Sequence, residues 1–375
     1  MNIYVWLVIL VVLLGWLMHG DQKGNTKYIV VACILLFCVY GLRDAYSIGN
    51  DSSSSYLHAF QRMENADWDD FPGPFDWMEN LSEHENEGRY DKNAGIVYAM
   101  KLVYDRTGGN YQTFVIIWSA ITMICFTHFI RRYSTSPLQS ILYFFGLLFY
   151  LLMFSALKQA MAMAFILLAF DGIMEKKLWK FLLWVVIASV FHYPALVFLP
   201  AYWIANMKLS RNYLFLLALL LLMVYFLRDQ IMDMMSNAYY GEEEGHTMEA
   251  AGRFLMNKVI VMLIIVVAAV LIRPPTDSDR QYTGLLALMG IAAVLQTFAG
   301  YGNIFERLAD YYFQFSVIFI PMVFDRSVRL DRRYLPVQTQ QLVQQVGPYV
   351  FCAFAIWRFL DAVQDPYLLP YHFGV

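Results

Sequence analysis

Residues 137–170 read PLQSILYFFGLLFYLLMFSALKQAMAMAFILLAF, which is two apolar runs with a single lysine, Lys158, between them. No other Asp, Glu, Lys or Arg lies between Arg132 and Asp171. Each run is close to the ~20 residues that an α-helix needs to cross ~30 Å of hydrocarbon. The stretch therefore predicts two membrane helices that meet at a lysine. Because a cation at such a place is costly, Lys158 is a candidate functional residue.

The composition of the whole chain indicates the same class of protein. Of its 375 residues, 59% are hydrophobic and 17% aromatic, whereas only 15% are charged, and the mean hydropathy is +0.47. A soluble protein of this length could not cover so much apolar surface with polar groups. We therefore predict an all-α polytopic membrane protein, with residues 1–375 as a single transmembrane domain. The net charge of −3 suggests no nucleic-acid partner.

The cysteines do not predict a metal site. All four lie in apolar stretches without metal-ligand spacing, at Cys33, Cys38, Cys125 and Cys352. Isolated cysteines in such surroundings are most often small buried hydrophobes. We assign them no chemistry and predict neither a metal nor another cofactor.

The order of apolar and basic segments predicts the topology. The first apolar run, 3–18, has no basic residue before it and no small-residue cleavage site after it, so we expect a retained helix. Lys23 and Lys27 follow, and the cytoplasmic bias of basic loops places them inside. Later spans are expected at 28–41, 111–130, 137–154, 159–174, 212–227, 254–272, 281–299, 308–324 and 342–360.

Segment 178–205 is long for one membrane helix and short for two. A single crossing would place the basic loop 325–333 outside, against the positive-inside bias. We therefore expect two short helices that meet near His192 and Pro194. With this choice the chain has about twelve membrane segments, some of them short or re-entrant, and every strongly basic loop lies inside.

Two polar segments fall outside in this topology. Residues 42–110 form a long extracytoplasmic segment in which we expect interfacial helices, and residues 228–253 form an acidic extracytoplasmic loop. Within the first segment, carboxylates alternate with aromatic residues at Asp67, Trp68, Asp69, Asp70, Phe71, Phe75, Asp76 and Trp77. This pattern suits a sugar-facing lid and an interfacial anchor equally well.

The topology also gathers several unusual polar residues near the outer face. They are Arg43, Asp44, Asp51, Lys158, His192 and Arg307. Charged residues in membrane helices face the bundle interior or a water-filled cavity, so this set predicts a polar cleft open to the outside. Such a cleft suits an anionic lipid headgroup.

Most of these residues also have a purely structural interpretation. Arg43 could extend its charge to the lipid headgroups, and Asp51 could cap a helix. His192 could be a hydrogen-bonded core histidine. Arg307 has one carboxylate beside it and another one turn later, as in an ordinary helical ion pair. Lys158 is the residue for which the sequence offers no such neighbour.

Four short stretches form a pattern along the chain. They are Gly41-Leu42-Arg43 with Ile48-Gly49-Asn50-Asp51 and Tyr56, then Phe154-Ser155-Ala156-Leu157-Lys158-Gln159, then Phe191-His192-Tyr193-Pro194-Ala195, and finally Arg307 with Tyr311 and Tyr312. In order and spacing this pattern resembles the EpsG family of bacterial, Wzy-like polysaccharide polymerases. The chain departs from the family at two places. Lys158 stands where the family more often has arginine, and Asn93-Ala94-Gly95 stands where many relatives carry a glutamate.

The resemblance implies a polysaccharide polymerase in the bacterial cytoplasmic (inner) membrane, with its cleft facing the periplasm or exterior. Its substrate would be an undecaprenyl-diphosphate-linked oligosaccharide. The growing glycan would move from this carrier onto the non-reducing end of a new lipid-linked repeat unit. Membrane lipid, a chain-length regulator and a flippase are the partners that such an enzyme would meet.

The chemistry of this transfer suggests a role for each candidate residue. Fixed cations stabilise the charge that develops on a leaving diphosphate, so the expected diphosphate-binding residues are Arg43, Lys158 and Arg307. The acceptor hydroxyl needs a base, for which we expect His192 or Asp51, and imidazole is the group that titrates near neutral pH. The family motifs add Asp44, Tyr56, Gln159 and Tyr311 as substrate-binding residues. No metal is required in this scheme.

Two other functions are compatible with the sequence. A lipid-linked oligosaccharide flippase or transporter would also have about twelve helices, but transporters often have related halves and a midplane site, whereas the candidates here lie at one face. Another polyprenyl-phosphate-dependent glycosyltransferase or ligase is chemically closer. Such enzymes typically place an acidic pair on the first outer loop, and here Asp44 and Asp51 are seven residues apart.

Overall fold

The structure is a computed structural model that describes residues 2–18, 22–75, 91–208, 279–299, 303–324 and 337–374, with a few helical positions between 219 and 269. Within these residues the regular secondary structure is helical, and the nearest approach to a strand is an isolated bridge between Arg43 and Phe373. The all-α prediction is confirmed. The predicted segments 212–227, 228–253, 254–272 and 325–333, and also Asp76 and Trp77, lie wholly or mostly outside the described residues.

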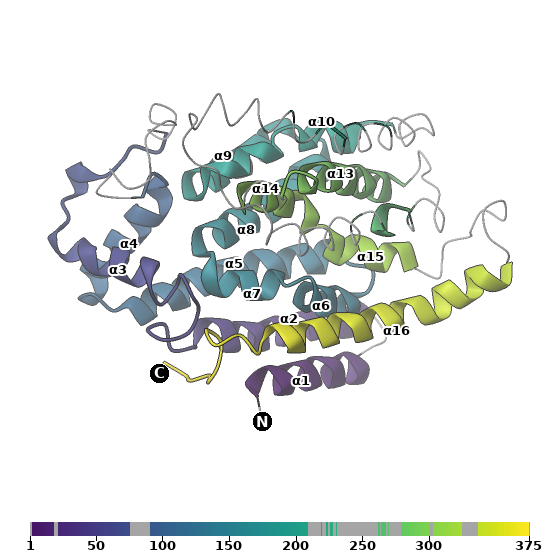
Figure 1. Ribbon diagram of the computed structural model, residues 1–375, viewed down its shortest axis with the longest axis horizontal. Helices are drawn as coiled ribbons and strands as arrows, with labels where there is room; N and C mark the ends of the chain where they lie inside the picture. The colour runs from purple at the N-terminus through teal and green to yellow at the C-terminus, as the bar shows by residue number, and fades with distance from the viewer. Residues whose placement is uncertain are drawn as a thin grey trace. The chain divides into compact units, whose positions relative to one another are not determined.

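The helices follow one another closely along the described chain (Figure 1). In chain order the α-helices are α1 (Ile3–Leu17), α2 (Gln22–Gly41), α3 (Ser55–Gln61), α4 (Ala94–Thr107), α5 (Tyr111–Tyr133), α6 (Pro137–Gly146), α7 (Phe149–Ser155), α8 (Leu157–Glu175), α9 (Leu178–Phe191), α10 (Ala201–Asn206), α13 (Arg280–Gln296), α14 (Asn303–Phe313), α15 (Ser316–Phe324) and α16 (Val337–Ala362). Short 3-10 helices are η1 (Arg62–Asn65), η2 (Trp68–Asp70) and η4 (Tyr193–Phe198).

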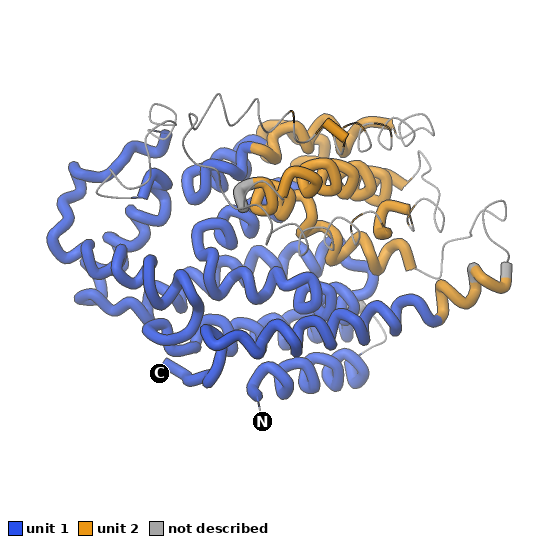
Figure 2. Tube along the Cα trace, in the orientation of Figure 1, with its two compact units in different colours: residues 1–170, 182–196, 346–375 blue, residues 171–181, 197–345 orange. Residues whose placement is uncertain are grey.

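The chain divides into two compact units. Unit 1 contains residues 1–170, 182–196 and 346–375, and unit 2 contains residues 171–181 and 197–345 (Figure 2). Within unit 1, α2 packs along α5, α1 packs against α2 and α6, and α4 packs against α5. Within unit 2, α13 packs against α10, α14 and α15.

Several helices of the described part could cross a membrane. Three are long and apolar enough to do so, namely Lys23–Gly41 within α2, then α5, then α8. The pair α6 and α7 gives a fourth candidate span, bent by 51° at its break, and α1 and α9 are shorter apolar helices. In length and composition these helices are consistent with a membrane protein. The full number of about twelve segments stays a prediction, and so does the outer cleft.

Two local features differ from the sequence prediction. Lys23 and Lys27 were expected in a loop, but they lie in the first turns of α2, because the helix begins at Gln22. The apolar run 137–154 was expected to form one helix, but it is broken after Gly146. A Cβ on Gly146 would come within 2.4 Å of the Cα of Ala355 in α16, so only glycine permits this close approach of α16 to the break.

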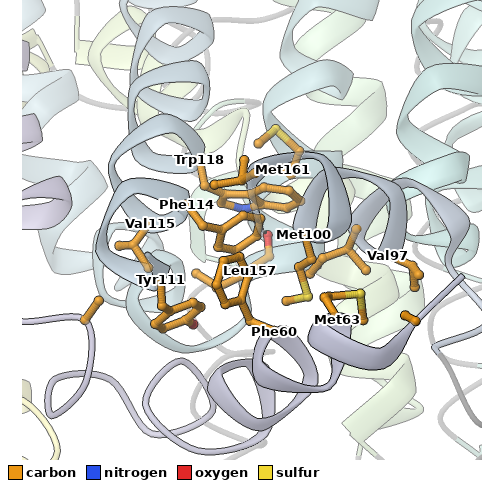
Figure 3. Packing of buried hydrophobic residues seen from close by; sticks show 14 of the residues in the cluster. Phe60, Met63, Val97, Met100, Tyr111, Phe114, Val115, Trp118, Leu157 and Met161 are labelled. Carbon is orange, nitrogen blue, oxygen red and sulfur yellow. Dashed lines mark hydrogen bonds between the residues drawn. The ribbon is translucent and has the colours of Figure 1, made fainter. Parts of the chain in front are cut away.

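The core of unit 1 joins the polar segment after α2 to the membrane helices. An apolar cluster packs α3 and η1 against α4, α5 and the start of α8 (Figure 3). Its labelled members are Phe60, Met63, Val97, Met100, Tyr111, Phe114, Val115, Trp118, Leu157 and Met161. The indole N–H of Trp118 donates to the carbonyl of Leu157 at 2.9 Å. Because Leu157 directly precedes Lys158, this core sets the position of the Lys158 backbone.

Candidate functional site

Arg43 follows the end of α2 and is fully buried. Its guanidinium donates to the carbonyl of Tyr40, to the carbonyl of Ile48 at 3.2 Å and to the hydroxyl of Ser52 at 3.1 Å. The same group lies 3.5 Å from the carbonyl of Phe154 and 4.8 Å from the centre of the Phe154 ring. Each guanidinium nitrogen therefore meets an acceptor within the protein. Arg43 holds the loop 42–54 against the end of α7.

Gly49 allows this loop to make its closest contact with α7. Its φ is +100°, and a Cβ at this position would lie 2.2 Å from the carbonyl oxygen of Phe154. A side chain would be both strained and in collision with the backbone here. The stretch from Arg43 to Asp51 thus forms a turn that rests on the end of α7, directly before Lys158.

Lys158 lies in the first turn of α8 and is paired with Asp91. Its Nζ donates to Oδ2 of Asp91 at 2.7 Å, and the two side chains are 18% and 28% exposed. The other carboxylate oxygen accepts hydrogen bonds from the backbone and side-chain N–H groups of Asn93, at 2.8 and 2.7 Å. The side-chain oxygen of Asn93 accepts from the backbone N–H of Tyr193 at 2.9 Å. A continuous chain of polar contacts therefore links Lys158 to the residue after His192.

His192 lies at a helix break and is 4% exposed. Its backbone N–H donates to the carbonyl of Ala188, and its own carbonyl accepts from the N–H of Ala195, both at 2.9 Å. The predicted break near His192 is confirmed, since α9 ends at Phe191. Gly95 lets α4 approach this break, because a Cβ there would lie only 2.9 Å from the ring of Phe191.

Asp91 is the residue of this site that the sequence prediction missed. Burial alone would raise its pKa, but the charge of Lys158 and the hydrogen bonds from Lys158 and Asn93 outweigh burial and lower the pKa below its ordinary value. The Asp91 carboxyl is therefore ionised at neutral pH. Asp91 follows other acidic residues in a polar segment, so no spacing sets it apart. Many relatives carry a glutamate where this chain has Asn93-Ala94-Gly95. In this chain Asp91, two residues before Asn93, supplies a carboxylate close to that place.

Asp44 stabilises its own turn. Its carboxylate accepts hydrogen bonds from the backbone N–H of Tyr46 at 3.1 Å and from the hydroxyl of Ser47 at 2.5 Å. Aspartate commonly closes turns in this way. Substrate binding by Asp44 stays a prediction.

Asp51 and Tyr56 lie on either side of the start of α3. Asp51 is half-buried, and its carbonyl accepts from the N–H of Tyr56 at 2.9 Å. The interpretation of Asp51 as a helix cap was wrong, because α3 begins at Ser55 with Ser54 in the N-cap position. The ring of Tyr56 packs against the apolar cluster of unit 1.

The remaining candidates lie on α8 and α14. Gln159 is buried, with its side-chain nitrogen 3.8 Å from the sulfur of Met163. On α14, Arg307 is exposed and Tyr311 is buried. The three candidate cations are divided between the units, since Arg43 and Lys158 belong to unit 1 and Arg307 to unit 2. In the described part of the chain, no three His, Cys, Asp or Glu side chains gather as metal ligands.

Comparison with known proteins decides the family. The model of the EpsG family matches residues 26–373, which is nearly the whole chain. The chain belongs to the EpsG family. The resemblance that the four short motifs indicated is thereby confirmed. No curated protein and no solved structure matches the chain.

In this EpsG-family protein, three of the four motifs lie in one connected arrangement within unit 1. The first motif forms the turn that rests on Phe154, and the second motif begins at that residue. The third motif is joined to the second through the contacts of Asp91 and Asn93. The fourth motif belongs to unit 2. Membership of the family suggests a polysaccharide polymerase-type membrane glycosyltransferase that acts on a lipid-linked saccharide.

Proposed function

We propose that this EpsG-family protein polymerises polysaccharide repeat units at the outer leaflet of the bacterial cytoplasmic membrane. It transfers the growing glycan from undecaprenyl diphosphate to the non-reducing end of a lipid-linked repeat unit. One observation carries the proposal most directly. Lys158, at the start of an apolar helix, is held by Asp91 in a polar chain that reaches the backbone beside His192. A membrane protein would not keep such a charged pair in a costly place without a use for it.

The transfer exchanges one bond at the anomeric carbon for another. The bond between that carbon and the diphosphate oxygen breaks, and the lipid diphosphate leaves with the electron pair. A new bond forms between the same carbon and the acceptor hydroxyl oxygen, whose proton passes to a base. Negative charge grows on the diphosphate as it leaves, so a fixed cation at that oxygen lowers the barrier.

The geometry suggests how the residues of unit 1 share this work. Lys158 contacts the diphosphate, and Asp91 orients the ammonium group through their ion pair. His192 accepts the proton, with Asp51 as the alternative base. Arg43 has all its nitrogens engaged within the protein, so we assign it the support of the turn before Lys158 in place of a direct diphosphate contact. Arg307 in unit 2 stays a proposed diphosphate contact.

The proposal is tested by polymer formation in a host that lacks its own polymerase. At matched membrane abundance, wild type should convert lipid-linked single repeats into a ladder, and Lys158→Ala should reduce this conversion about 100-fold or more. Lys158→Arg should keep the ladder, because arginine retains the charge and its fork matches phosphate oxygens. Lys177→Ala is the matched control, since Lys177 is exposed and pairs with Glu175.

Each alternative function predicts a different result. A ladder from Lys158→Ala equal to that of wild type would return Lys158 to a structural role. Single repeats that accumulate on the cytoplasmic face when the protein is absent would identify a flippase. Transfer of a glycan to an acceptor other than a lipid-linked repeat would identify a different polyprenyl-phosphate-dependent glycosyltransferase or ligase.

A further inference from the structure

A pair of exposed aromatic rings lies where the polar segment after α2 meets α4. Trp68 of η2 is 44% exposed and Tyr98 of α4 is 37% exposed, and their ring centres are 5.9 Å apart. The largely buried Phe71 contacts both rings edge-on, with centre distances of 5.8 Å to Trp68 and 5.5 Å to Tyr98. We call Trp68 and Tyr98 the aromatic platform. The buried Phe71 ring supports the platform, and both platform residues are partly exposed.

The platform is held firmly in place. Nζ of Lys101 on α4 donates to the carbonyl of Met63 at 3.1 Å, which ties η1 to α4, and Lys101 also pairs with Asp105 at 2.9 Å. Met63 itself belongs to the buried apolar cluster of unit 1 (Figure 3). Lys101 is buried, and its ammonium group makes this attachment. The ring contacts with Phe71 bring Trp68 and Tyr98 together without a ligand, which reduces the entropic cost of binding.

The platform lies close to the proposed reaction centre along α4. Asn93, which contacts Asp91 and the backbone of Tyr193, is the N-cap of α4. Tyr98 follows five residues later, which is a rise of about 7.5 Å along the helix axis. A sugar chain attached to a diphosphate at Lys158 can therefore reach the platform with its first few rings.

The surroundings of Trp68 favour a sugar over a lipid as the ligand. Three neighbouring carboxylates are exposed, at Asp67, Asp69 and Asp70. Carboxylates accept hydrogen bonds from sugar hydroxyls, whereas their insertion into a bilayer is costly. The negative face of an aromatic ring attracts the C–H groups on the face of a pyranose. Trp and Tyr alone would also suit the membrane interface, whereas anionic lipid headgroups would repel three adjacent carboxylates.

We propose that the aromatic platform and the carboxylates of residues 67–70 form a carbohydrate subsite that binds the glycan of the lipid-linked substrate. The subsite rests on the proposed polymerase function, because it lies next to that reaction centre. It binds the sugars and leaves the diphosphate to Lys158. Its loss should therefore weaken substrate binding and leave the chemical step intact.

The first test compares the kinetics of Trp68→Ala and Tyr98→Ala with wild type in purified protein. The KM for the lipid-linked repeat should rise about 3- to 10-fold in each variant, the range that one aromatic contact provides. The kcat should stay within about twofold of wild type. Trp68→Phe keeps an aromatic ring, so its KM should stay close to that of wild type. Trp179→Ala is the control, because Trp179 is 67% exposed on α9 and outside the subsite.

A second measurement separates this inference from the polymerase proposal. A free single-repeat oligosaccharide, released chemically from its carrier, is the probe in saturation-transfer NMR with wild type and Trp68→Ala. Loss of the saturation signal in Trp68→Ala supports the subsite even when no ladder forms and the polymerase proposal fails. An unchanged KM together with an unchanged saturation signal overturns the subsite while the polymerase proposal stands.

Discussion

At the scale of single residues, Lys158 shows what a local pattern can and cannot predict. The apolar runs on both sides identify it as unusual, because no charged neighbour is near in sequence. Its partner Asp91 lies 67 residues earlier, so no local spacing could reveal the pair. For the same reason the burial of Arg43 was not predicted, since its acceptors include the carbonyl of Phe154, which is 111 residues away. The sequence identifies charged residues whose burial in apolar surroundings is energetically costly. Only the packing identifies the partners of these residues.

The ion pair of Lys158 and Asp91 predicts a specific dependence of stability on pH. A carboxyl whose pKa is lowered by folding adds stability above its unfolded pKa of about 3.9 and loses it as the pH falls through the lowered value. Wild type should therefore be more stable than Asp91→Asn by a constant amount, about 1–3 kcal/mol, from pH 8 down to pH 5. The difference should shrink only below about pH 4. Thermal unfolding of the detergent-solubilised proteins measures it.

Asp105→Asn is the control for this comparison. Asp105 also pairs with a lysine, Lys101, but its side chain is 37% exposed, so the loss should be about 1 kcal/mol or less. If the difference between wild type and Asp91→Asn already closes between pH 7 and pH 5, the pKa of Asp91 is not lowered.

At the scale of elements, the long helices follow directly from the apolar runs. The predicted ranges 111–130 and 159–174 correspond to α5 at Tyr111–Tyr133 and α8 at Leu157–Glu175. The break between α6 and α7 was not predicted, because the apolar run 137–154 carries no local sign of it, and neither does it show that Ala355 of α16 packs against Gly146. Helix length is thus encoded locally, whereas the packing of α16 beside the break involves a segment that is distant in sequence.

The loop after α2 shows the same dependence on distant segments. Residues 366–374, which we call the strap, bind this loop through backbone hydrogen bonds from Gly49 to Tyr367 at 2.9 Å, from Asp44 to His372 at 2.8 Å and from Gly374 to Leu42 at 3.0 Å. The hydroxyl of Tyr371 also donates to the carbonyl of Val39 at 2.8 Å. The loop is therefore held between the strap and α7, and nothing in its own sequence predicts the strap.

The contact between this loop and α7 can be tested at Gly49. Gly49→Ala should cost about 2–5 kcal/mol, because the new Cβ would be strained and would press on the carbonyl of Phe154. Polymer formation should also fall in Gly49→Ala, since the turn supports the backbone before Lys158. Gly108→Ala is the matched control: Gly108 also has a positive φ, +65°, but nothing lies within 4 Å of its added Cβ. It should cost about 1 kcal/mol and keep activity. Equal losses in the two variants would mean that the loop does not need its contact with α7.

At the scale of the whole molecule, the contacts within unit 2 bear on the topology. The guanidinium of Arg280, at the start of α13, donates to the carbonyl of Met174 at 2.7 Å and to the side-chain oxygen of Asn206. The end of α8, the end of α10 and the start of α13 therefore meet. The ring of Phe181, near the start of α9, lies 5.4 Å from that of Tyr202 in α10. After the break at His192, the chain therefore turns back so that α10 lies beside the beginning of α9.

This return supports the prediction that residues 178–205 form two short segments and not one crossing. The length of the segment and the basic-loop bias led to that prediction, and the only local signs of a turn within the segment were His192 and Pro194. Composition predicted the membrane class and the apolar runs predicted most described helices. The division into two units depends on long-range packing that no window of sequence contains.

If residues 178–205 form a helical hairpin, the two lysines that flank the segment lie on the same side of the membrane. Lys177 and Lys208 are both exposed, and they must lie on the same side of the membrane if the chain turns back between them. In a background without native cysteines, Lys177→Cys and Lys208→Cys should both resist a membrane-impermeant thiol reagent in intact cells, and both should react after permeabilisation. The positive-inside bias gives the same expectation for each. Gln364→Cys, on the predicted outer side, is the control that should react in intact cells. If Lys208→Cys reacts in intact cells while Lys177→Cys does not, the segment crosses once, every later loop changes sides, and Arg307 no longer shares the face of Lys158.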